Sequence, residues 1–124
     1  MAGMIRSSPD PIVWHKPMDL ALEVYGLTKR FSKTETYRLV HRVARAAPLV
    51  PANMAEEYAR DSPNDCARFL AIARGSLMEV ETFLQLAIRL SCPVSRDAQT
   101  ALGLMDPISR ILTGLRTKML RSRE

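Results

Sequence analysis

The residues of this chain best suited to chemistry are arginines that recur at helical spacing. Four basic side chains fall within an arc of about 100° when residues 36–47 are drawn as a helix: Arg38, His41, Arg42 and Arg45. Apolar residues lie opposite, and no acidic residue occurs between residues 36 and 55. Because a guanidinium fork donates paired hydrogen bonds to phosphate oxygens, Arg38, Arg42 and Arg45 are candidate nucleic-acid contacts.

Two other interpretations of these arginines stay open. The face is either simply solvated, or it pairs with carboxylates of a neighbouring subunit. The acids available for such pairing are Glu56, Glu57, Glu79 and Glu81. A second basic set closes the chain: Arg110, Arg116, Lys118, Arg121 and Arg123. Compensation of a helix dipole at its C-terminal end is an adequate explanation for that set.

The histidines argue against a metal centre. A ferritin-like di-iron site needs Glu-x-x-His on an inward helix face, and no glutamate of this chain is followed by histidine at that spacing. The histidines are His15 and His41, and His15 is better explained by a surface pair with Asp19. We therefore expect no metal and no other cofactor.

Nucleophilic catalysis is not indicated either. Ser76 follows Gly75 but lies within a helical pattern, without the strand and turn of a nucleophile elbow. We expect Gly75 to let two helices approach closely, and Cys66 to be a small core residue. With no glycine-rich phosphate loop, the chain is predicted not to be an enzyme and to have no small-molecule substrate.

Composition places the chain among small soluble globular proteins. Its 124 residues are enough for one domain, and 47% hydrophobic with 25% charged residues excludes general disorder. The two cysteines, Cys66 and Cys92, form no CxxC pair, and the N-terminus has no apolar signal region. No charge-free window could span a membrane. We expect a cytoplasmic protein with no membrane association, and the net charge of +5 is compatible with a nucleic-acid partner.

Hydrophobic periodicity predicts four helices over residues 16–31, 35–60, 63–90 and from 95 onward. Pro48 and Pro51 should kink the second of these. The fold class is then all-α, an antiparallel up-down-up-down four-helix bundle with a kinked second helix. We expect residues 1–12 to form an irregular tail, 13–121 the bundle domain and 122–124 a frayed C-terminus.

Local signals fix the expected helix ends. Pro17 suits a first helical position, and residues 32–35 read as a capping box between the first two helices. Ser62 should cap the amide of Asp65, with Pro63 at the first position of the third helix. Ser95 is the expected N-cap of the fourth helix.

Some apolar residues exceed what one core needs. The fourth helix carries Leu104 and Ile111 off its main stripe, and the first carries Leu20, Leu22 and Leu27 beside its own stripe. A stripe wider than the core requires indicates a second buried face, and hence self-association into a homo-oligomer.

A set of residues resembles a known family. The opening resembles that of the small bacterial "four helix bundle protein" family, with the run VWHK at 13–16, LALEVY at 20–25, Leu27-Thr28 and Phe31. The central run, RAA at 45–47 followed by VPANMAE at 50–56, resembles its hallmark, an alanine pair followed by Ile-Pro-x-Asn-Ile-Ala-Glu. The stretches 69–77 and 79–81 continue the match, which covers about 13–120.

The resemblance implies a fold and an assembly, and little chemistry. Members are known as products of intervening sequences in 23S rRNA genes, were once labelled ribosomal-protein-like, and are antiparallel four-helix bundles that assemble as ring-like homopentamers. A distant relative is the basic, pentameric accessory protein of a diversity-generating retroelement, which engages nucleic acid and reverse transcriptase. The family has no catalytic residues to transfer.

This chain departs from the family's pattern at a few positions. They are Pro17, Arg38, Pro48, Glu57 and Ser91. Pro48 and Glu57 flank the hallmark, so the geometry of the second helix is where a difference is expected.

Two functions of different classes follow. The first is a non-enzymatic, ring-like homopentameric scaffold that binds RNA or DNA through Arg38, Arg42 and Arg45. The alternative is a protein-interaction scaffold whose same arginines engage an acidic protein partner.

Overall fold

The computed structural model describes residues 11–30, 37–90 and 92–122, and within them the chain forms six helices and no strand. The helices are α1 (Pro11–Arg30), α2 (Tyr37–Ala46), α3 (Leu49–Tyr58), α4 (Pro63–Leu90), α5 (Cys92–Asp97) and α6 (Gln99–Ser122). The predicted all-α class is confirmed.

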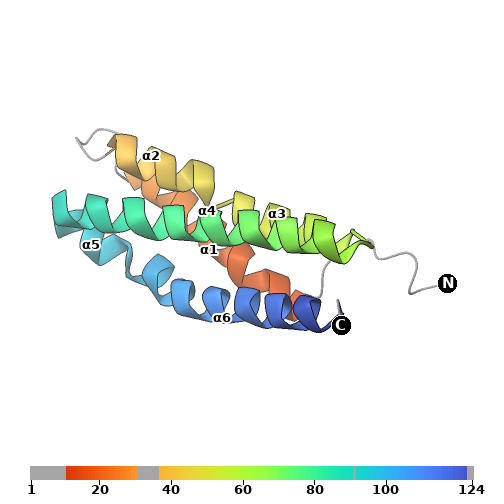
Figure 1. Cartoon of the computed structure of the whole chain (residues 1–124). Helices are drawn as coiled ribbons and strands as arrows, with labels where there is room; N and C mark the ends of the chain where they lie inside the picture. The colour runs from red at the N-terminus through yellow and green to blue at the C-terminus, as the bar shows by residue number, and fades with distance from the viewer. Residues whose placement is uncertain (1–10, 31–36, 91, 123–124) are drawn as a thin grey trace.

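The long helix α4 is the element on which most of the others pack. Helices α2 and α3 follow one another along one side of α4, and α6 runs along another side (Figure 1). Helix α1 packs against α2, α3 and α6. The side chains of α1, α2, α3, α4 and α6 therefore enclose one shared core.

The first helix starts earlier than predicted. Residues 11 and 12, expected in the irregular tail, belong to α1, and Pro17 lies inside the helix rather than at its first position. Pro17 is fully buried, so its ring contributes to packing. Its carbonyl clash and missing donor are local costs that burial of the apolar face outweighs. At the other end, helix α6 extends to Ser122, the first residue of the expected frayed C-terminus. Residues 1–10 and 123–124 lie outside the described part, as does the capping box at 32–35.

The second predicted helix is broken where the prolines suggested. Helix α2 ends at Ala46, a turn covers Ala47 and Pro48, and α3 begins at Leu49. The amide of Val50 donates to the carbonyl of Ala47 at 3.2 Å, a three-residue step that tightens the turn. The kink is thus a full interruption, because Pro48 has no N–H with which to continue the ladder.

The start of the third predicted helix is confirmed and that of the fourth is not. Helix α4 spans Pro63–Leu90, and the Asp65 amide donates to Ser62 Oγ at 3.4 Å. Before α6, however, the short helix α5 forms, and Ser95 lies inside it. Ser95 therefore does not cap α6; its carbonyl accepts a bond from Gln99 Nε2 at 2.7 Å.

The core is formed by the stripes that periodicity predicted on α4 and α6. On α4 the buried series includes Ala73, Leu77, Val80, Leu84 and Ala87. On α6 it is Ala98, Ala101, Met105, Ile108 and Leu112. On α1 the buried residues include Leu20, Val24 and Leu27 beside Pro17, so two of the leucines attributed to a second face belong to the core itself. Leu104 and Ile111 are half-buried and pack against the same core.

Specific polar contacts hold α3 in place. Trp14 Nε1 on α1 donates to the carbonyl of Pro51 at 3.2 Å, which ties the first helix to the first turn of α3. At the end of α3, the buried Cys66 thiol lies 3.5 Å from the carbonyl oxygens of Glu57 and Arg60. Cys66 is thus a core residue, as predicted, whose thiol also contacts backbone carbonyls at the end of α3.

Candidate nucleic-acid interface

Helix α2 is fixed in rotation by its apolar side. Val40, Val43 and Ala47 are fully buried, and Ala44 is half-buried. A 10-residue helix with one face anchored in the core cannot turn, so the residues opposite must point outward. The predicted separation of the two faces is confirmed.

The basic residues occupy that outward face. Arg38, His41, Arg42 and Arg45 are all exposed. They come from about two turns of one helix, so their charges are presented along one side of the molecule. The structure therefore brings together all four residues that spacing predicted.

Arg42 stacks on an aromatic ring of a neighbouring helix. Its Cζ lies 5.2 Å from the centroid of the Phe83 ring of α4. A guanidinium stacked on an aromatic face keeps its edge N–H groups available while the side chain loses conformational freedom. This contact prepares Arg42 to donate in a fixed direction, and no local sequence signal linked residues 42 and 83.

An acidic residue of the same chain borders the arginine face. Arg42, Arg45, Ala46, Leu49 and Glu79 line a shallow hollow of about 370 Å³ between α2 and α4. The sequence showed no acid from 36 to 55, but the fold brings Glu79 from α4 to this edge. The positive charge of Arg42 and Arg45 is therefore partly offset by the Glu79 carboxylate beside them.

The other acids considered as partners lie elsewhere. Glu56 pairs with Arg60, four residues later in the chain. The Cζ atom of Arg60 also lies 5.0 Å from the centroid of the Phe69 ring. Glu81 lines a different hollow, between α4 and α6, with Gln85 and Asp106. Neither borders the hollow beside Arg42 and Arg45.

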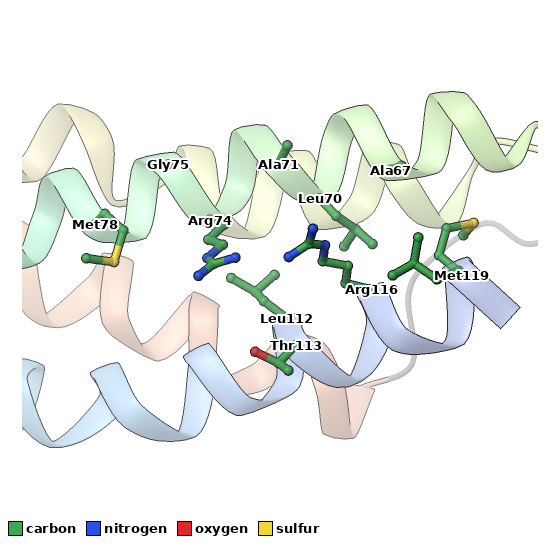
Figure 2. A pocket seen from close by; sticks show the side chains of 11 residues that line it. Ala67, Leu70, Ala71, Arg74, Gly75, Met78, Leu112, Thr113, Arg116 and Met119 are labelled. Atoms are coloured by element: carbon green, nitrogen blue, oxygen red, sulfur yellow. The ribbon is translucent and has the colours of Figure 1, made fainter.

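The second basic set divides into residues with different surroundings. Arg110 Nη2 pairs with Asp106 Oδ2 at 2.7 Å, which satisfies it locally. Arg116 lines a groove of about 510 Å³ between α4 and α6, together with Arg74 (Figure 2). Arg121 is exposed near the end of α6, and Arg123 lies outside the described residues. Dipole compensation alone does not describe Arg116, and sequence reasoning missed this groove because its walls are 42 residues apart in the chain.

The residues considered for catalysis occupy structural positions. Ser76 is buried on the core face of α4, and Gly75 beside it is exposed. A Cβ at Gly75 would meet nothing within 4 Å, so the expectation that it lets two helices of this chain meet closely is wrong. Among the described residues no group of three His, Cys, Asp or Glu side chains is placed to hold a metal ion. In the same residues, no helix is long and apolar enough to cross a bilayer.

Comparison with known proteins gives one family. The sequence model of the 23S rRNA-intervening sequence protein family matches residues 10–114 of the chain. No curated protein matches it. The matched range includes all of α2 with its four basic residues, and it ends within α6.

Proposed function

The chain belongs to the 23S rRNA-intervening sequence protein family, and on that premise we propose that it is a non-enzymatic, homo-oligomeric scaffold that binds nucleic acid. The contacts are Arg38, Arg42 and Arg45. The observation that carries the proposal is the arrangement of α2, whose buried valines hold the exposed arginines on one fixed outward face. A fixed row of guanidinium groups suits a phosphate backbone, whose charges are also regularly spaced.

The proposed architecture is the antiparallel up-down-up-down bundle. Rod one is α1, rod two is α2 and α3 in series, rod three is α4, and α5 with α6 forms rod four. The pairwise packing of these elements and the alternating chain direction in Figure 1 support it. We treat residues 13–121 as the bundle domain.

The proposed assembly is a ring-like homopentamer located in the cytoplasm. Exposed large apolar side chains on α1 and α4, among them Leu22, Tyr25 and Met78, support self-association, because such residues gain from burial. A ring would repeat the arginine face on every subunit. Repetition multiplies the phosphate contacts without requiring any base to be read, so we propose binding with little sequence preference.

A protein partner is the second candidate, favoured by one observation. Glu79 lies beside Arg42 and Arg45, and this carboxylate next to two arginines supports an acidic protein partner as the alternative. An acidic segment of another protein would then occupy the same face. Both candidates use the same arginines, so variants alone do not separate them.

The test is fluorescence anisotropy with a structured rRNA fragment, a single-stranded RNA and a DNA duplex, each at low salt. We expect micromolar or tighter binding by the wild type and a loss of at least tenfold in the Arg38→Ala/Arg42→Ala/Arg45→Ala variant. A polyglutamate competitor at equal charge should displace the nucleic acid poorly. Absence of nucleic-acid binding at low salt would overturn the proposal, and efficient displacement by polyglutamate would favour the protein partner.

A further inference from the structure

The groove between α4 and α6 has an apolar floor and a straight, open wall. Leu70 and Leu112 lie at its base, and Met78 and Met119 are among its lining residues (Figure 2). On α4 the wall carries small residues four apart: Ala67, Ala71 and Gly75. These lie along one face of the helix over roughly 12 Å, and the space above Gly75 is open to 4 Å. The surface therefore has the shape that a second helix could lie along.

Two arginines give the groove its charge. Figure 2 shows Arg74 of α4 and Arg116 of α6 lying in the space between the two helices, one from each wall. Both are exposed. An occupant of this groove must therefore combine an apolar stripe with carboxylates beside it.

Helix α1 carries a pattern of that kind on its outer side. Met18, Leu22 and Tyr25 are 36%, 68% and 60% exposed, and their spacing of four and three residues puts them on one stripe. This is the anchor spacing with which amphipathic helices enter grooves. Asp19 and Glu23, one turn apart, lie together on one side of the stripe. Lys29 stacks on Tyr25 with Nζ 5.2 Å from the ring centroid, more than two turns beyond Asp19.

We propose that the outer stripe of α1 in one copy of the chain docks into the α4–α6 groove of the next copy, with Asp19 and Glu23 facing Arg74 and Arg116. The inference rests on the self-association in the proposed function and names the surfaces that make it. The contact joins two different surfaces, so an open assembly has one free stripe at one end and one free groove at the other until a ring closes.

The test measures mass by size-exclusion chromatography with light scattering at micromolar concentration. Leu22→Glu removes the central anchor, and Gly75→Leu adds a bulky side chain to the groove at a position where a Cβ atom would meet nothing within 4 Å. Gly75→Leu also replaces a poor helix former, so the fold is retained. We expect both variants to shift from oligomer to monomer with unchanged helical circular dichroism. The matched controls, Leu90→Glu at 70% exposure and Gly103→Leu at an equally open glycine, should remain oligomeric.

Charge reversal tests the pairing itself. Asp19→Lys with Glu23→Lys, or Arg74→Glu with Arg116→Glu, should each raise the dissociation constant of the assembly at least tenfold. All four substitutions in one chain should restore it. A wild type that is monomeric overturns the inference. An oligomer indifferent to Leu22→Glu and Gly75→Leu also overturns it, while leaving self-association in place, and the rRNA anisotropy assay reports separately on the α2 face.

Discussion

Glu79 is the residue that modifies the candidate site most. It lines the hollow beside Arg42 and Arg45, and no ion pair with either arginine forms within 4 Å in the described residues. Its charge lowers the positive potential there, at a distance where solvent screens it only in part. A phosphate approaching this edge therefore meets repulsion as well as attraction.

Neutralising Glu79 should strengthen nucleic-acid binding. For Glu79→Gln we expect the dissociation constant for the rRNA fragment to fall about two- to fivefold at low salt, the size of one exposed charge interaction. Asp61→Asn, in the exposed turn between α3 and α4, removes the same charge and is the control. Equal tightening by both variants would mean that only net charge matters, and weaker binding by Glu79→Gln would contradict the assigned face.

The sequence predicted correctly which helix face carries the arginines, but it did not predict which side chains of α4 lie next to them. Helical spacing placed Arg38, Arg42 and Arg45 on one exposed face because that face depends only on the residues of one helix. The stacking of Arg42 on Phe83 and the approach of Glu79 depend on how α2 meets α4. No periodicity within either helix contains that information.

At the scale of the element, the two faces of α4 differ sharply in burial. Leu84 is fully buried, and Leu86 on the same helix is 44% exposed. For Leu84→Ala we expect a loss of about 2–5 kcal/mol in the free energy of unfolding, from lost transfer energy and the cavity left behind. Leu86→Ala should cost under about 1 kcal/mol.

The measurement is urea unfolding followed by circular dichroism, at one protein concentration for wild type and both variants. Comparable losses for the two leucines would show that the α4 face containing Leu86 is buried too, against the exposure that the structure gives it.

Helix boundaries were predictable where a complete local signal exists. Helix α4 starts at Pro63 with Ser62 bonded to the Asp65 amide, and proline and cap agree there. Pro17 gave a misleading signal. Proline often occupies the first position of a helix, so the sequence predicted that α1 begins there, but Pro17 lies inside α1 with its ring buried. Ser95 was the predicted N-cap of the last helix, but it lies inside the short helix α5. The local sequence pattern did not distinguish these two positions.

At the scale of the whole molecule, self-association was predicted from stripe width for partly wrong reasons. Leu20 and Leu27 belong to the core, and the exposed residues that remain on α1 are Met18, Leu22 and Tyr25. The groove that would receive them needs α4 and α6 side by side, a juxtaposition no single segment encodes. Composition and the family pattern predicted the fold class. The two surfaces proposed for self-association could be identified only from the packing of the helices.

The central claim is that phosphates bind the arginine face of α2, and that binding does not simply follow the net charge of the chain. The most direct measurement is the slope of log Kd against log salt for the rRNA fragment, compared between three proteins. These are the wild type, Arg38→Ala/Arg42→Ala/Arg45→Ala, and a control that loses equal charge elsewhere, Arg68→Ala/Arg110→Ala/Arg121→Ala.

Each phosphate contact contributes about 0.7–0.9 to that slope. We predict that the α2 variant reduces it by about 2 to 3 for each bound chain, and the control by less than 1. Equal reductions in the two variants, or an unchanged slope in the α2 variant, would contradict the account.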